Sequence, residues 1–164
     1  MFNLKKSFIL FAAIFSLGTY GEDRCIKLEN LNTEFIEETC LISTSKPDQK
    51  FTLIEFFTTT CSTCKKNLPL LKVLHDKWND ILSIKIVSLN PQKGLIEDFI
   101  EDYKEHINYP VYFDQRREAK RKYKVRLVPT LLLFKEGVGQ VFRHTGKMDD
   151  VAIQKIESFF KEER

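Results

Sequence analysis

The chain has 164 residues, 43% of them hydrophobic, with 26 lysines and arginines, 23 acidic residues and a formal net charge of +3. This length and apolar content suit one globular domain that buries its own core. The near balance of charge excludes the strong basic bias of a nucleic-acid-binding protein, so we expect no nucleic-acid partner.

Residues 1–21 have the layout of a signal peptide. Lys5 and Lys6 precede an apolar run from Phe8 to Leu17, and small or turn-forming residues follow. The run is too short to cross a bilayer as a helix, which takes about 20 residues. We expect cleavage between Gly18 and Gly21 and export of the mature protein, with an uncleaved membrane anchor as the alternative.

Residues 22–50 are expected to form an N-terminal extension, in which the segments around Cys25 and Cys40 are short edge strands. The run "FTLIEFF", residues 51–57, is typical of a central strand covered on both faces, and only Glu55 breaks it. From Cys61 the apolar spacing becomes helical, and "ILSIKIVSLN", residues 81–90, predicts a second buried strand.

The second half of the chain alternates in the same way. Residues 93–108 predict a helix and residues 110–113 a short strand. A basic helix follows, then a β-hairpin whose turn spans Lys135 to Gly139, and a final helix from about Met148. Helices interleaved with strands indicate an α/β structure with a mixed sheet.

The densest basic run is "RREAKRKYKVR", from Arg116 to Arg126. We interpret it as the solvated face of a short helix, because Ala119, Tyr123 and Val125 provide an inward side. The alternative is a surface that docks an acidic partner or anionic lipid head groups.

Cys61 and Cys64 stand where the first long helix begins. A metal site would need a second Cys pair or a paired His, but His75, His106 and His144 occur singly, so we expect no metal. Two thiols on the first helical turn suit redox chemistry, because the helix N-terminus stabilises a thiolate on Cys61. Cys61 would attack and the shielded Cys64 would resolve the mixed disulfide. Glu55, in the preceding strand, could take the proton of Cys64, unless it points to water at a strand edge.

These residues resemble the thioredoxin-like thiol:disulfide oxidoreductases. Glu55 lies six positions before Cys61, Pro69 lies eight positions after it, and "VRLVPTLLLFKEG" is similar to the family's cis-proline loop and following strand. Gly146 matches the glycine before the last helix. The resemblance implies a thioredoxin fold, that is, a central mixed sheet flanked by helices, here with an N-terminal hairpin and an inserted helix-strand element.

The resemblance also implies a substrate site. Val128 and Pro129 would lie beside the cysteine pair, the backbone of Val128 pairing with an extended substrate, and Thr60 stands where the family usually has tryptophan. The inner dipeptide is Ser62-Thr63 instead of Gly-Pro, which leaves the direction of electron flow open. The inserted segment from Gly94 to Phe113 is similar to the exported TlpA/ResA-like branch, whose members commonly reduce disulfides, including those of apocytochrome c.

Four cysteines allow three pairings. The helix-start geometry selects Cys61 with Cys64 and leaves Cys25 to pair with Cys40, as a structural disulfide in an oxidising compartment. The alternative makes Cys25 or Cys40 a second redox relay that exchanges with Cys61.

We therefore expect a signal peptide (1–21), an extension (22–50) and a thioredoxin-like domain (51–164). The predicted activity is exchange with protein disulfides or dithiols in the bacterial periplasm, by a monomer without a bound cofactor. A membrane electron donor or acceptor would recharge Cys61 and Cys64. The competing hypothesis is a binding module of the same fold, for example a copper chaperone, without redox turnover.

Overall fold

The computed structural model describes residues 25–26, 28–32 and 40–163, so the expected signal peptide lies outside the described residues. The described chain forms one mixed sheet in the order β1-β4-β3-β2-β5-β6. The strands are β1 (Glu29–Asn30), β2 (Phe51–Phe57), β3 (Leu82–Ser88), β4 (Val111–Phe113), β5 (Thr130–Lys135) and β6 (Gly139–Thr145). The helices are α1 (Ser62–Trp78), α2 (Lys93–Asp102), α3 (Glu118–Lys122) and α4 (Asp150–Lys161).

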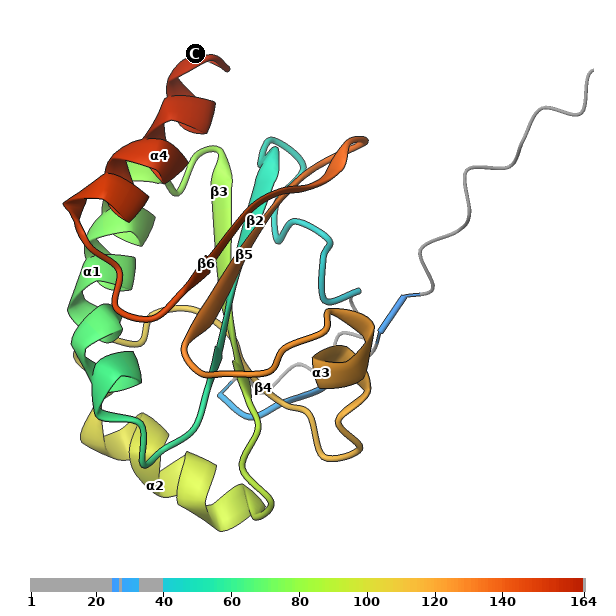
Figure 1. The fold of residues 1–164 in the computed structure, drawn as a ribbon, viewed down its shortest axis with the longest axis vertical. Coiled ribbons are helices and arrows are strands. Elements are labelled where there is room, and N and C mark those ends of the chain that lie inside the picture. The colour runs from blue at the N-terminus through green and yellow to red at the C-terminus, as the bar shows by residue number, and fades with distance from the viewer. Residues whose placement is uncertain (1–24, 27, 33–39, 164) are drawn as a thin grey trace, which may run out of the picture.

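Helices cover both faces of the sheet, with α1 and α4 on one side and α3 on the other (Figure 1). Every residue of β2 and β3 is buried, as expected for parallel central strands. Successive side chains of β2 alternate between two cores: Leu53 packs in the cluster that includes α1 and α4, and Ile54 packs in the cluster with Ala119 of α3. The predicted central mixed sheet flanked by helices is confirmed, including the inserted α2 and β4.

Two helix boundaries differ from the prediction for local reasons. The helix expected over residues 93–108 ends at Asp102, because residues 103–106 form a turn in which the His106 amide donates to the Tyr103 carbonyl (2.9 Å). The last helix begins at Asp150 instead of near Met148, because the Asp149 carboxylate accepts a hydrogen bond from the Ala152 amide (2.8 Å) and caps the helix. The basic helix is short, as expected: Arg117 and Lys124, on either side of it, adopt left-handed backbone conformations with φ of 56° and 51°.

The predicted N-terminal hairpin is wrong for the part of the chain that the structure describes. Cys25, Ile26 and Leu28 are not in a strand, and residues 41–43 form a turn. The strand is instead Glu29–Asn30, which pairs antiparallel with β4. This strand covers the edge of β4. The Leu41 amide donates a hydrogen bond to the Ile26 carbonyl (3.0 Å), and both side chains are buried in the core cluster that contains Ala119 of α3.

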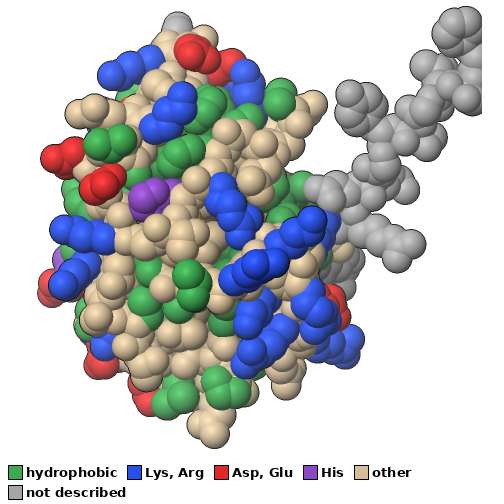
Figure 2. Space-filling view, in the orientation of Figure 1, with side chains coloured by type: hydrophobic (Ala, Val, Ile, Leu, Met, Phe, Trp, Pro, Cys, Tyr) green, Lys and Arg blue, Asp and Glu red, His purple; other side chains and the backbone are tan. Residues whose placement is uncertain are grey.

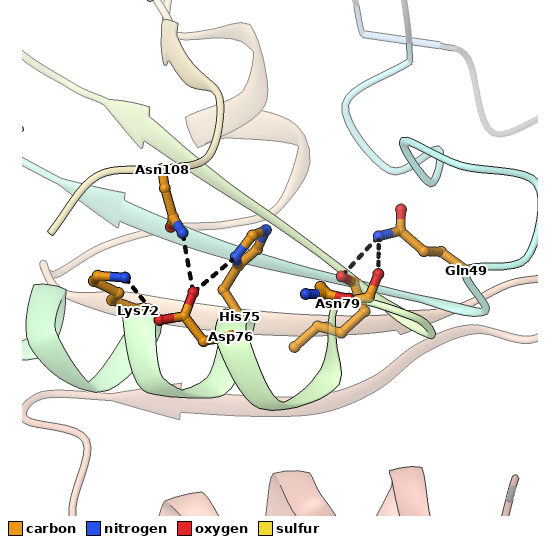
Figure 3. Close-up of polar contacts among 7 residues, drawn as sticks. Gln49, Lys72, His75, Asp76, Asn79 and Asn108 are labelled. Carbon is orange, nitrogen blue, oxygen red and sulfur yellow. Dashed lines mark hydrogen bonds and ion pairs between the residues drawn. The ribbon is translucent and has the colours of Figure 1, made fainter.

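Polar side chains fix the C-terminal end of α1 against its surroundings (Figure 3). The Asp76 carboxylate receives hydrogen bonds from Lys72 (2.7 Å) and Asn108 (3.1 Å). The buried Gln49 amide donates to the carbonyls of Asn79 and Leu82, both at 2.9 Å. These contacts hold the turn between α1 and β3 in place.

Candidate active site

Cys61 and Cys64 form a disulfide at the N-terminus of α1. Cys61 is the N-cap residue, and its Sγ accepts a hydrogen bond from the Cys64 amide (3.1 Å). Cys61 is partly exposed and Cys64 is 1% exposed. The same amide and the helix dipole would stabilise a thiolate on the outer sulfur. The pair therefore has an accessible and a shielded sulfur.

Glu55 lies in the middle of β2, buried on the side of the sheet that faces α1. Its Oε2 accepts a hydrogen bond from Asn67 Nδ2 (3.1 Å). Burial raises the pKa of Glu55 to about 8, and the hydrogen bond from Asn67 opposes this rise. Glu55 does not point to water, and its carboxyl group can both hold and release a proton near neutral pH.

Asn67 links this carboxyl group to the helix that carries the cysteine pair. It lies on α1 three residues after Cys64, so the two residues occupy neighbouring positions on one face of the helix. Its Oδ1 accepts a hydrogen bond from the buried Met148 amide (2.9 Å). Sequence reasoning missed Asn67; the available signal was a polar residue directly before Leu68 on the apolar face of the helix.

Tyr109 is a second residue that sequence reasoning missed. Its ring is buried and lies 6.1 Å from the ring of His75 on α1. Burial, and to a lesser extent the charge of Glu55, raise the pKa of Tyr109. Tyr109 packs in the same core cluster as Cys64. Its hydroxyl has no hydrogen-bond partner among the described residues.

Val128 and Pro129 lie at the same end of the sheet as the cysteine pair. A cis peptide bond joins them. In the antiparallel register Thr130 of β5 pairs with Phe56 of β2, so the two residues before Thr130 run alongside the end of β2 that leads into Cys61. The Gly146 amide donates to the Pro129 carbonyl (2.9 Å), and Gly146 has a φ of 105° that favours glycine.

The loop between β2 and α1 carries Thr60, which is exposed. Asn90, which follows β3, holds this loop: its Oδ1 accepts from the Thr59 amide and its Nδ2 donates to Thr59 Oγ1, both at 2.9 Å. Pro69 lies inside α1. Thr60 is therefore placed at the rim of the site and Pro69 on the helix that carries the pair.

Cys25 and Cys40 form the second disulfide, in the N-terminal extension. Lys85 of β3 is buried next to this extension. Its Nζ donates to the carbonyls of Cys40 (3.2 Å) and Ser43 (2.6 Å). Burial lowers the pKa of Lys85 to about 8. The neighbouring β2 residue, Ile54, packs in the α3-side core. This disulfide and Lys85 therefore belong to the side of the sheet opposite Glu55.

Potential metal ligands are dispersed. His75 is on α1, His106 follows α2, and His144 is on β6 with its Nε2 2.9 Å from the Lys147 carbonyl. Within the described residues no three His, Cys, Asp or Glu side chains come together as a metal site.

The strand order, the cysteine pair at the start of the first long helix and the cis proline opposite it define a thioredoxin fold. A family model described as thioredoxin-like matches residues 48–141, more than half of the chain. The chain belongs to the thioredoxin-like family.

The chain is also similar to two curated proteins. The chain is 25% identical over 151 residues to "Thiol-disulfide oxidoreductase ResA" of Oceanobacillus iheyensis, covering 86% of this chain and 76% of that protein. It is 28% identical over 99 residues to "Sporulation thiol-disulfide oxidoreductase A" of Bacillus subtilis, covering 58% of each.

Solved structures agree on the fold. The crystal structure of StoA from Bacillus subtilis has a TM-score of 0.58 and 26% identity, with 71% of this chain and 92% of that chain covered. A thiol:disulfide interchange protein DsbE from Chlorobium tepidum has a TM-score of 0.61 and 16% identity, with 83% and 94% covered. Among the described residues no helix is long and apolar enough to cross a membrane.

Proposed function

We propose that this protein is an exported thiol:disulfide oxidoreductase that reduces disulfides in extracytoplasmic proteins. The observation that carries the proposal is the Cys61-Cys64 pair at a helix N-terminus, on the helix whose next turn holds the buried Glu55 carboxyl group through Asn67. The names of the curated relatives support the reaction class.

The first half of the reaction uses the outer sulfur. In the reduced protein the Cys61 thiolate attacks one sulfur of the substrate disulfide, forms a mixed disulfide and releases the other substrate sulfur as a thiolate. The α1 N-terminus and the Cys64 amide favour the thiolate form of Cys61. Val128 and Pro129 hold the substrate in an extended conformation alongside the end of β2, and Thr60 contributes to the rim.

The second half uses the shielded sulfur. The Glu55 carboxylate accepts the proton of Cys64, whose thiolate attacks Cys61 Sγ, breaks the mixed disulfide and releases the second substrate thiolate. The substrate gains two electrons as two thiolates, which take up one proton returned by Glu55 and one from solvent, and Cys61 and Cys64 become the disulfide. With a pKa of about 8, Glu55 is close to half-ionised in mildly alkaline solution and can make this transfer without a cofactor.

The signal-peptide layout of residues 1–21 and the resemblance to the TlpA/ResA-like branch support an extracytoplasmic setting. A membrane electron donor returns two electrons to the pair after each turnover, because the periplasm does not supply them. Apocytochrome c is the substrate class that this resemblance favours. The Cys25-Cys40 disulfide has a structural role in this scheme.

Two variants test the cysteine roles. Cys61→Ser should abolish reduction of insulin disulfides by the mature protein, because the attacking sulfur is lost. Cys64→Ser should instead accumulate a mixed disulfide between Cys61 and the substrate, detectable by non-reducing mass mapping. Insulin reduction that survives Cys61→Ser would contradict the proposal.

The equilibrium potential of the pair tests the direction. Equilibration with redox buffers followed by thiol alkylation should place it near about −270 mV, the value for thioredoxin, if the protein is a reductant. A potential near about −120 mV would mean that it forms disulfides instead.

A further inference from the structure

Basic side chains line a groove beside the proposed substrate site. This basic groove has a volume of about 510 Å³ and is lined by Lys124, Arg126, Leu127, Thr130, Arg143 and Thr145. A smaller hollow shares Lys124 and Arg126 with it and extends toward α3. Figure 2 shows the lysine and arginine side chains gathered over this part of the surface.

Strand register places the basic groove at the active-site end of the sheet. Thr130 pairs with Phe56 on one side and with Thr145 on the other. The residues on both sides of Val128 and Pro129, Leu127 and Thr130, line the groove. A substrate that runs past Val128 and Pro129 would enter it within a few residues, since an extended strand advances about 3.3 Å per residue.

The walls of the groove are held in position. Arg143 of β6 donates to the carbonyls of Tyr123 and Lys124, both at 3.0 Å, and so fastens the end of α3 to the sheet. In the part of the chain that the structure describes, no carboxylate lies within ion-pair distance of Lys124, Arg126 or Arg143. Leu127, which is 67% exposed, adds an apolar contact at the rim.

Positive charge is concentrated in this region. Residues 114–126 contain seven lysines and arginines and two acidic residues, whereas the whole chain carries a net charge of only +3. The rest of the chain is therefore net acidic. Such an asymmetric charge distribution attracts acidic partners to one place on the surface.

We propose that the basic groove binds acidic side chains of the protein substrate, close in sequence to the cysteine that Cys61 attacks. This inference rests on the proposed function and adds a substrate class to it: disulfides flanked by aspartate or glutamate. A hollow that starts at the substrate loop fits a peptide segment, and we assign it to the substrate in preference to an anionic membrane surface. The proposal takes up the alternative that the sequence left open for Arg116 to Arg126, a surface that docks an acidic partner.

The experiment compares two synthetic peptides with one internal disulfide. They differ only in the residues on both sides of the cysteines, which are aspartate in one peptide and asparagine in the other. The measurement is the second-order rate constant for their reduction by the reduced mature protein. The aspartate peptide should react about tenfold faster at low salt, and the ratio should shrink toward one as salt screens the charges.

Charge reversal should remove this preference. In the Lys124→Glu/Arg126→Glu protein the ratio of the two rate constants should fall to one or below. Lys46→Glu/Lys155→Glu, at exposed lysines away from the groove, changes the net charge equally and should keep the wild-type ratio. Thermal unfolding checks that each variant is folded, and Lys124→Gln/Arg126→Gln provides a milder second variant that should also lose the preference.

The outcomes separate the two proposals. Equal rates for both peptides with the wild-type protein would overturn the acidic-substrate inference and leave the oxidoreductase function standing. No reduction of either peptide would overturn both. Sedimentation of the protein with phosphatidylglycerol vesicles tests the membrane alternative. If the Lys124→Glu/Arg126→Glu variant keeps the peptide preference but no longer sediments with these vesicles, the inference would be overturned in favour of a membrane-binding surface.

Discussion

At the residue scale, the two central strands each carry one buried ionisable side chain. Glu55 on β2 faces α1, and Lys85 on β3 faces the N-terminal extension. Both pKa values lie near 8, raised for the acid and lowered for the base, because burial disfavours the charged form of each. The two groups have different partners: Glu55 accepts a hydrogen bond from Asn67 on the helix that carries the cysteine pair, and Lys85 donates to main-chain carbonyls.

Glu55 makes stability depend on pH. Its carboxyl group has a pKa of 4.5 in the unfolded chain and about 8 in the folded protein. Between these values the folded protein holds a proton that the unfolded chain has lost. The free energy of unfolding should therefore fall as the pH rises through this range, by on the order of 5 kcal/mol.

Urea unfolding at several pH values between roughly 5 and 8, inside the range of the two pKa values, measures the slope of the free energy of unfolding against pH. In Glu55→Gln the slope should largely disappear. Glu163→Gln, at a surface carboxylate paired with Lys50 and Lys135, serves as the control and should keep it. An unchanged slope in Glu55→Gln would show that another group is responsible.

Some of these residues could be found from the sequence and others could not. Glu55 interrupts a run of apolar residues, and the two cysteines have a fixed spacing, so local sequence is enough to select them. Asn67 accepts a hydrogen bond from the Met148 amide, 81 residues away in the chain. Arg143 donates a hydrogen bond to the Tyr123 carbonyl, 20 residues away. Such partners are set by tertiary packing, which no local pattern encodes.

At the element scale, Asn67 ties α1 to two other parts of the fold. Its side chain bonds to Glu55 on β2 and to the Met148 amide in the segment before α4. Both groups are buried. One side chain therefore sets how the helix that carries Cys61 and Cys64 sits on the sheet.

Asn67→Ala should destabilise the protein by about 2–3 kcal/mol, because it leaves a buried amide and a buried carboxyl group without their partner. Urea unfolding at a pH near 6, roughly midway between the two pKa values of Glu55, measures the loss. Asn108→Ala removes an exposed amide bonded to Asp76 and should cost less than about 0.5 kcal/mol. A comparable loss of stability in both variants would contradict the proposed role of Asn67 in fixing α1 to the sheet.

Element types were predictable because their apolar spacing is regular. The continuous apolar runs of β2 and β3 and the helical spacing of α1 and α4 each determine one kind of element. Residues 22–50 lack such a pattern, and the strand expected around Cys25 forms instead at Glu29 and Asn30. Its partner is the edge of β4, which is more than 80 residues later in the chain, so the pairing depends on the completed sheet.

At the scale of the whole molecule, the N-terminal extension is fastened by the Cys25-Cys40 disulfide, which joins positions 15 residues apart. Closing a loop of this size in the unfolded chain is worth about 3 kcal/mol. Cys25→Ser/Cys40→Ser should lower the free energy of unfolding by about that amount while retaining reduction of insulin, if the disulfide is structural.

Cys61→Ser/Cys64→Ser provides the comparison for stability. The Cys61-Cys64 disulfide joins positions only three residues apart. Removing it should therefore lower the free energy of unfolding by about 1 kcal/mol less than removing the Cys25-Cys40 disulfide. Loss of insulin reduction in the folded Cys25→Ser/Cys40→Ser protein would instead support the relay role for this pair.

The hydrogen bonds from Lys85 to the carbonyls of Cys40 and Ser43 have a consequence for the smallest part of the chain that can fold alone. The residues that match the family begin at 48. A fragment starting there would contain every strand from β2 onward, yet the amine of Lys85 would lose both carbonyl acceptors, and the core cluster that contains Ala119 would lose Leu41. Such a fragment should therefore be less stable than a chain that begins before Cys40.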